Sequence, residues 1–200
     1  MDLVTALGRI VPFAFASGVN LYATIAVVGL CSRFHLISLP DQFRAFDNPV
    51  IIAAAIAMYL IEFVADKIPW FDTVWDAVHT VIRPIGGALV AVSALGDASP
   101  AMQTAAALFG GSVAMTSHLT KAGTRAAANT SPEPFSNWML SLLEDVFVVG
   151  LTWFAVQHPF WAAAITVVLL IAIIAFASVI IRAVRRRFGS RDLTTRSIRL

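Results

Sequence analysis

The stretch AAAITVVLLIAIIAFASVII, from Ala162 to Ile181, decides what kind of fold this chain can adopt. It contains no charged residue. As a helix its twenty residues would extend about 30 Å, which is the thickness of the hydrocarbon core of a bilayer. The sequence therefore predicts that this segment crosses a membrane and faces lipid.

The composition of the whole chain agrees with a membrane protein. Of its 200 residues, 58% are hydrophobic and only 13% are charged, whereas soluble domains carry about 25% charged residues. So few charges cannot coat a soluble surface of this size. We expect an all-α fold, a polytopic bundle of about six transmembrane helices. It would form a single transmembrane domain over residues 1–184, followed by an Arg-rich cytoplasmic tail over residues 185–200.

Six apolar stretches are long enough to be membrane spans. They cover residues 7–31, 50–65, 74–95, 101–120, 138–156 and 160–181. The first contains Pro12 and, at its centre, Ser17-Gly18-Val19-Asn20, which weaken a helix, so we expect a break near Gly18–Asn20. A half-helix starting there would aim its N-terminus at an anion. The helix pairs 50–95 and 101–156 also resemble each other loosely, which suggests a weak internal repeat.

Basic residues gather at the C-terminus. Seven of the fourteen Lys and Arg residues lie in the last 19 positions, namely Arg182, Arg185, Arg186, Arg187, Arg191, Arg196 and Arg199. Such a tail stays on the cytoplasmic side and attracts anionic lipid headgroups. With six spans, both termini would be cytoplasmic. Membrane lipids are the expected partners, a homo-oligomer is an open arrangement, and nucleic acid is not expected for a lipid-bound body.

Polar residues recur at helical spacing inside the predicted spans, so each set shares one helix face. The sets are Glu62 and Asp66; Asp72, Asp76, His79 and Arg83; His118, Lys121 and Arg125; and Asn137, Ser141 and Glu144, with Asp145 beside them. A charge in hydrocarbon costs at least about 2.5–3.5 kcal/mol, so these groups should face the bundle interior and pair. We expect a polar cavity or buried network that opens to the cytoplasm, in which Arg83 pairs with Glu144 or Asp145.

These sets supply the candidates for ligand binding or for relay of protons and ions. The candidates are Asn20, Glu62, Asp66, Asp76, His79, Arg83, His118, Lys121, Arg125, Glu144 and Asp145. No catalytic residue is predicted, because the chain has no nucleophile elbow, H-E-x-x-H motif or phosphate loop. No cofactor is expected. Metal binding is undecided, since two histidines and several carboxylates suit a divalent cation but no metal-binding pair lies on one helix.

Several motifs carry a family resemblance. They are Ser17-Gly18-Val19-Asn20-Leu21-Tyr22; the run from Glu62 to Pro69 with Asp72, Trp75-Asp76, His79-Thr80 and Arg83-Pro84; the run from His118 to Arg125; the run from Asn129 to Pro134; and Glu144-Asp145. Together they resemble the bacterial integral-membrane family known as domain of unknown function 4126. The resemblance implies a membrane protein and supplies no activity or catalytic residue.

Three functional classes remain open. The first is a transporter or channel-like protein for a small ion, a polar solute or an anionic lipid headgroup. In it Arg83, Lys121 and Arg125 would hold an anion, while the acids and histidines would relay protons. The second is an accessory or structural membrane subunit without transport. The third, which the sequence favours least, is an intramembrane enzyme that uses Asp76 and His79 for acid–base chemistry.

Overall fold

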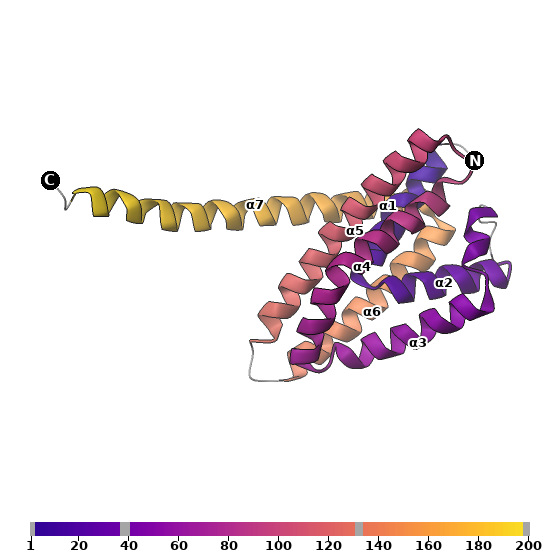
Figure 1. Ribbon diagram of the computed structural model, residues 1–200, viewed down its shortest axis with the longest axis horizontal. Coiled ribbons are helices and arrows are strands. Elements are labelled where there is room, and N and C mark those ends of the chain that lie inside the picture. The colour runs from indigo at the N-terminus through magenta and orange to yellow at the C-terminus, as the bar shows by residue number, and fades with distance from the viewer. Residues whose placement is uncertain (1–2, 37–40, 131–133, 198–200) are drawn as a thin grey trace. The chain divides into compact units, whose positions relative to one another are not determined.

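The computed structural model describes residues 3–36, 41–130 and 134–197, and these residues form helices joined by short connections (Figure 1). The elements are α1 Leu3–Val19, α2 Leu21–Arg33, the short 3-10 helix η1 Asp41–Ala45, α3 Pro49–Ala65, α4 Pro69–Leu95, α5 Pro100–Ala128, α6 Pro134–Gln157 and α7 Pro159–Ser197. The described residues contain no strand, so the all-α prediction is confirmed. The chain divides into two units, residues 1–166 and 167–200, which are described separately.

Proline and short polar side chains define where the helices begin. Helices α3 to α7 each start at a proline, which suits the first helical position because its missing N–H has no acceptor there. Asn48 caps α3 by accepting a hydrogen bond from the Val50 amide at 2.8 Å. These starts fix the turns that separate successive helices, so the polar faces of neighbouring helices are held in register.

The predicted interruption of the first apolar stretch is present. Helix α1 ends at Val19 and α2 begins at Leu21, with Asn20 in an extended conformation between them. The Asn20 side-chain oxygen accepts a hydrogen bond from the Ala23 amide at 2.9 Å and so caps α2. Pro12, by contrast, lies inside α1. The break therefore places a capped helix N-terminus deep within the bundle, where Asn20 is only 1% exposed.

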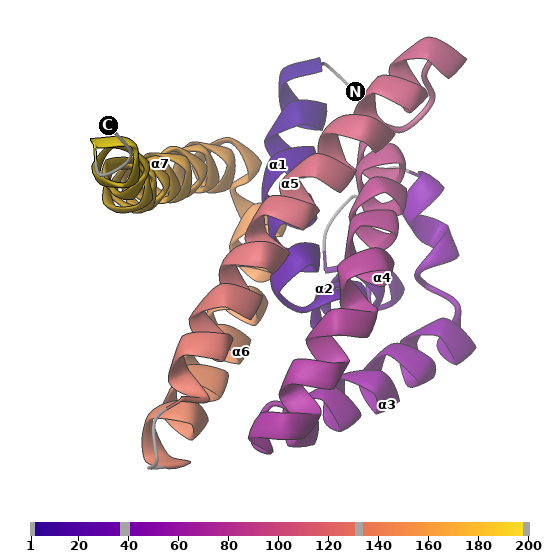
Figure 2. The same cartoon turned by 60° about the vertical axis from the view of Figure 1, so that its left-hand side comes forward.

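Small residues allow α1, α4 and α5 to approach closely. A methyl group added at Gly18 would collide with the Ser117 hydroxyl and with the Ala114 backbone of α5, and one added at Gly87 of α4 would collide with the Ala114 methyl. Gly110 of α5 faces Ala91 of α4 in the same way. Small residues at such crossings are typical of helix packing in membranes. Figure 2 shows these helices running alongside one another.

Helices α1 and α2 do not form one continuous crossing. The start of α1 lies at the turn between α6 and α7, because a methyl group on Gly8 would be 3.2 Å from the Pro159 carbonyl carbon. After the break, the chain returns to α1, where the rings of Phe43 in η1 and Phe13 lie 5.7 Å apart. Phe13 precedes the break by about 10 Å of helix. The chain thus enters the bundle along α1 and turns back within it.

Three helices are long and apolar enough to cross a membrane: α4, α6 from Phe135, and the first part of α7, over Pro159–Ala183. Only 6% of the apolar window of α7 is buried within the protein, which leaves its side chains for lipid. Helices α1, α2 and α3 are apolar but shorter. The chain is therefore a membrane protein, and length and composition support three of the six expected crossings. Helix α7 itself continues through Ser197, beyond the expected start of the tail at residue 185.

A buried ion-pair network as the candidate functional site

The predicted polar faces meet inside the first unit. The polar side chains from α3 to α6 that are at most 7% exposed include Glu62, Asp66, Asp72, Asp76, His79, Arg83, Ser117, His118, Lys121, Arg125, Asn137, Ser141 and Asp145. The Glu144 side chain is 14% exposed. The expectation that these groups face the interior is confirmed, and we call them, together with Lys67, the network.

Arg83 lies at the centre of the network and has no exposed surface. Its Nη2 is 2.8 Å from Glu62 Oε1 on α3, and its Nη1 is 3.2 Å from Asp76 Oδ1 on its own helix. It also donates to the Gly18 carbonyl at 3.3 Å, at the end of α1. The prediction that Arg83 pairs with an acid of another helix is confirmed. The prediction that this acid is Glu144 or Asp145 is wrong, because the acid paired with Arg83 from another helix is Glu62 of α3.

Lys121 connects α5 with α3 and α6. Its Nζ is 3.1 Å from Glu62 Oε1, 3.0 Å from Asp66 Oδ2 and 3.8 Å from Glu144 Oε2. Glu62 Oε1 therefore accepts hydrogen bonds from both Arg83 and Lys121. Charge-assisted hydrogen bonds of this kind are stronger than neutral ones, and in a buried site they fix the positions of all the groups involved.

Arg125 forms the end of the network nearest the turns between α3 and α4 and between α5 and α6. Its Nε lies 3.3 Å from Asp72 Oδ1 and 3.9 Å from Glu144 Oε2, and its Nη2 lies 3.7 Å from Asp66 Oδ2. The guanidinium also donates to the backbone carbonyls of Asp66 and Asn137. All three of its nitrogens thus donate hydrogen bonds, to Asp72, Asn137 and Asp66.

Some network residues and some of their direct partners were absent from the sequence-based candidates. Asn129 donates to Asp72 Oδ2 at 2.7 Å, and Asn137 donates to the Asp66 carbonyl at 3.3 Å. Helical spacing had placed Asp72 and Asn137 on the polar faces of α4 and α6, but they were not counted among the candidates for ligand binding or relay. Tyr22 and Thr80 were also missed. Each contacts a network histidine, which spacing within one helix does not reveal.

Hydrogen bonds fix His118 in a neutral form. Its Nδ1 is 2.8 Å from Arg83 Nη1, and because a guanidinium can only donate, Nδ1 must accept. Its Nε2 lies 3.0 Å from Thr80 Oγ1, whose own proton goes to the Asp76 carbonyl. Nε2 therefore carries the hydrogen of His118, and a second ring proton would point at Arg83.

His79 has a different arrangement, which leaves one nitrogen free to accept or donate. Its Nδ1 is 2.7 Å from the Trp75 carbonyl and so carries a hydrogen. Its Nε2 is 2.9 Å from the Tyr22 hydroxyl, which is both donor and acceptor. The His79 ring stacks on Trp75 with centroids 4.5 Å apart. His79 can therefore exchange a proton at Nε2 by reorienting the Tyr22 hydroxyl, whereas His118 cannot do so without facing Arg83.

The two adjacent acids of α6 face different sides. Glu144 points to Lys121 and Arg125 of α5, whereas Asp145 Oδ1 accepts a hydrogen bond from Asn20 Nδ2 at 3.3 Å. Asn20 thus caps α2 through its oxygen and holds Asp145 through its nitrogen. The sequence predicted an anion at this helix N-terminus. The group beside it is the Asp145 carboxylate of the protein itself.

Lys67 lies in the turn between α3 and α4, at the edge of the network. Its Nζ donates to the Phe63 carbonyl at 2.8 Å and to Ser141 Oγ at 3.3 Å, and it lies 3.1 Å from the centre of the Phe63 ring. Burial lowers the pKa of the Lys67 ammonium, and the charge of Asp145 is the largest opposing influence. Lys67 is therefore a positive charge held close to α6 by neutral groups.

Acids outnumber bases in the network. The acids are Glu62, Asp66, Asp72, Asp76, Glu144 and Asp145, and the bases are Lys67, Arg83, Lys121 and Arg125. Six carboxylates against four cations leave an excess of two negative charges when both histidines are neutral. In the described part of the chain, no group of three or more His, Cys, Asp or Glu side chains is placed to hold a metal ion.

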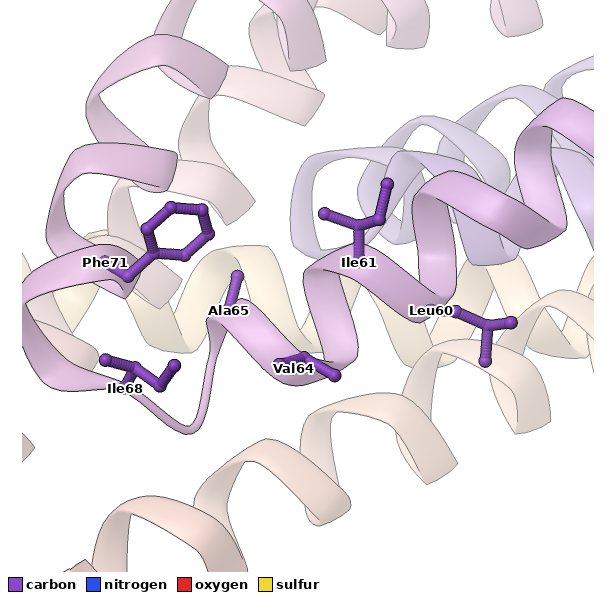
Figure 3. Close-up of a pocket in the computed structure, with 6 residues that line it drawn as sticks. All are labelled: Leu60, Ile61, Val64, Ala65, Ile68 and Phe71. Atoms are coloured by element: carbon purple, nitrogen blue, oxygen red, sulfur yellow. The ribbon is translucent and has the colours of Figure 1, made fainter.

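A groove beside α3 and the start of α4 is apolar. It has a volume of about 450 Å³ and is lined by Leu60, Ile61, Val64, Ala65, Ile68 and Phe71 of α3, α4 and their turn (Figure 3). None of the network side chains lines it. The network is thus a cluster of buried ion pairs that does not form the wall of this groove.

An all-α membrane protein whose helices enclose a dense cluster of buried ion pairs is the class that the fold and the site define. The sequence model of the family described as Domain of unknown function (DUF4126) matches residues 7–178, and the chain belongs to this family. The matched residues include the break at Asn20 and every member of the network. No curated protein and no solved structure matches the chain.

Proposed function

We propose that this protein is a transporter for a small cation, with the proton as the first candidate, and that the network is its binding site. The observation that carries the proposal is the excess of two carboxylates in the network, whose charged side chains are almost completely buried except for Lys67 at its edge. An uncompensated charge in such a site costs several kcal/mol. Bound protons or another small cation would remove this cost, so the network is suited to take them up.

The pairing of the basic residues favours a cation over the other ligands that the sequence left open. Arg83 contacts two carboxylates, and Lys121 and Arg125 contact three each. An anionic solute or lipid headgroup would have to compete with these carboxylates for bases that each already contact at least two of them. A proton or cation would instead join acids that lack one.

The break between α1 and α2 supports the same function. Interrupted helices place polar groups at the middle of the membrane in many transporters. Here the first turn of α2 contacts the network twice, through Asn20 on Asp145 and through Tyr22 on His79. Both contacts involve groups that can take up a proton. A change of protonation would therefore be felt directly by α2.

The accessory or structural role remains the second candidate, and one observation favours it. The network is buried, and its pairs connect α3, α4, α5 and α6 in a single cluster. Polar contacts between helices stabilise membrane bundles without any transport. A purely structural network would be expected to hold its protons at all accessible pH values.

Proton flux into proteoliposomes separates the two roles. A pH gradient is imposed across vesicles that contain wild type, Asp145→Asn or Asp97→Asn, and its decay is followed with an internal pH dye. Asp97 is an exposed acid in the turn between α4 and α5 and serves as the matched control. The proposal expects at least a fivefold faster decay than in empty vesicles for wild type and Asp97→Asn, and loss of this flux in Asp145→Asn. Decay equal to that of empty vesicles for a folded wild type would favour the accessory role.

The proposal includes the inner membrane of a bacterium as the location, with the Arg-rich tail in the cytoplasm on anionic lipid headgroups. The sequence alone also assigned the N-terminus to the cytoplasm. The packing of Gly8 on Pro159 places the start of α1 beside the turn between α6 and α7. If α7 crosses the membrane, this turn and the cytoplasmic tail lie on opposite sides, which supports an outer position for the start of α1. We therefore propose that α1 and α2 enter and leave the membrane on the outer side. Association with a second copy stays open.

A further inference from the structure

Asp145 differs from the other acids of the network in its partners. The ion pairs of the described residues include the other five acids and not Asp145. Its Oδ1 is held by the neutral amide of Asn20, and its Oδ2 is buried without a hydrogen-bond partner, as is one oxygen each of Glu62, Asp66, Asp76 and Glu144. The residue is only 6% exposed. Asp145 is thus a buried carboxyl with one oxygen fixed and the other available.

Lys67 is the corresponding base. The ion pairs of the described residues give it no carboxylate partner, although Arg83, Lys121 and Arg125 each have at least two. Its Nζ is held by the Phe63 carbonyl and by Ser141 Oγ. Ser141 precedes Asp145 by one helical turn, which is a rise of about 6 Å along α6. A rotation of the flexible Lys67 side chain over one turn would bring it to Asp145.

We propose that Asp145 Oδ2 is a proton-binding position and that Lys67 competes with the proton for it. When the proton is bound, Asp145 is neutral and Lys67 stays on Ser141. When the proton leaves, the Lys67 ammonium moves to the carboxylate and replaces it as the neutralising charge. The inference rests on the proposed function in naming the proton as the bound species, but binding at Asp145 can be measured without transport.

The groups around Asp145 are consistent with this competition. The titratable and charged groups that act on it are Tyr59 and Glu62 of α3, Asp66 and Lys67 of the following turn and Lys121 of α5, and Glu144 precedes it in its own helix. The broken helix contributes the neutral amide of Asn20. Lys121 is occupied by three other acids. Lys67 is therefore the base that can change partners without leaving a carboxylate behind.

Protonation of Asp145 also fits the charge balance. It removes one of the two excess negative charges of the network. The Asn20 amide can donate to Oδ1 in both states of Asp145, because the proton goes to the other oxygen. Glu144, whose contacts with Lys121 and Arg125 are the long ones at 3.8 and 3.9 Å, accounts for the second excess charge.

Dicyclohexylcarbodiimide tests the proposal, because it reacts with protonated carboxyl groups in apolar surroundings. The full-length protein in liposomes is treated between pH 5 and 9, and modification of Asp145 is measured by mass spectrometry. We expect modification at acidic pH that falls at least tenfold at alkaline pH. Asp145→Asn should show no modification at that position, and Asp97→Asn should behave as wild type. No modification of Asp145 at any pH, or equal modification at all pH values, would overturn the proton site.

Variants of Lys67 test the competition. Lys67→Gln removes the competing charge. At an alkaline pH where little Asp145 is modified in wild type, the modified fraction of Asp145 in Lys67→Gln should be at least threefold higher. Lys67→Arg keeps the charge and should follow wild type. Equal pH profiles for all three proteins would overturn the role of Lys67. If Lys67→Gln does not fold, Lys67→Met is the second neutral variant, and the same criterion applies to it.

The outcome of this experiment is independent of the flux measurement. If Asp145 shows the expected pH profile and no proton flux occurs, the proton site is supported and the transport function fails. If protons are transported and Asp145 is never modified, the transport function is supported and this inference fails.

Discussion

Arg83 and Glu62 form an ion pair of 2.8 Å in which neither side chain has any exposed surface. The same Glu62 oxygen accepts a hydrogen bond from Lys121 at 3.1 Å, so one carboxylate joins α3, α4 and α5. Buried pairs of this kind are costly to break from one side, because the remaining charge has no water to solvate it. The pair is therefore the most sensitive point of the network for stability.

Truncation of Arg83 should destabilise the protein strongly. Arg83→Ala leaves Glu62 with Lys121 alone and Asp76 without its basic partner, and we expect a loss of about 3–5 kcal/mol. Thermal unfolding in detergent micelles measures the loss. Arg33→Ala is the matched control, since its 3.7 Å pair with Asp47 is exposed, and it should cost less than about 1 kcal/mol. Equal melting temperatures for the two variants would show that the buried pair is not needed.

Two glycines should respond in opposite directions to the same substitution. A methyl group at Gly18 collides with the Ala114 backbone and Ser117, so Gly18→Ala should cost about 1–3 kcal/mol or prevent folding. At Gly150 a methyl group meets nothing within 4 Å, so Gly150→Ala should stabilise α6 by about 0.5–1 kcal/mol. Melting temperature and the monodisperse fraction on gel filtration measure both effects. A tolerated Gly18→Ala would contradict the close contact of α1 with α5.

Helical spacing predicted much of the candidate site. Residues three or four apart share a face of a helix, and Asp72, Asp76, His79 and Arg83 are all buried as this rule requires. The break at Asn20 was also predictable, because Gly18 and Asn20 weaken a helix in an otherwise apolar stretch. Both predictions depend only on the local chain, which the sequence determines directly.

The partners across helices were not predictable in the same way. Spacing within α4 gives the face that carries Arg83 but not the helix that this face meets, so Glu62 of α3 was not distinguished from Glu144 of α6. Tyr22 reaches His79 only because the chain turns at Asn20. The fold of α1 and α2 back along the bundle depends on packing between distant residues, such as Phe13 on Phe43, and a hydropathy pattern does not contain this information.

Membrane sidedness can be tested with single cysteines in a Cys31→Ser background. We expect cysteines at Asp2 and Asp97 to react with a membrane-impermeant maleimide in intact cells, since the start of α1 and the turn between α4 and α5 lie at the same end of the first unit (Figure 1). Cysteines at Thr130 and Ser190 should react only after permeabilisation. If the cysteine at Asp2 reacts only after permeabilisation, as the one at Thr130 should, the N-terminus is cytoplasmic.

Substitutions of His118 should show that it acts as a hydrogen-bond acceptor for Arg83. His118→Gln offers a carbonyl oxygen to Arg83 and an amide to Thr80, and should cost about 1–2 kcal/mol. His118→Lys offers only donors and adds a second buried cation beside Arg83, so we expect a loss of more than about 3 kcal/mol or no folded protein. His158→Lys, in the exposed turn between α6 and α7, is the control for the charge itself and should melt as wild type does. If His118→Lys is as stable as His118→Gln, the ring is not an acceptor for Arg83, and the neutral form of His118 must be abandoned.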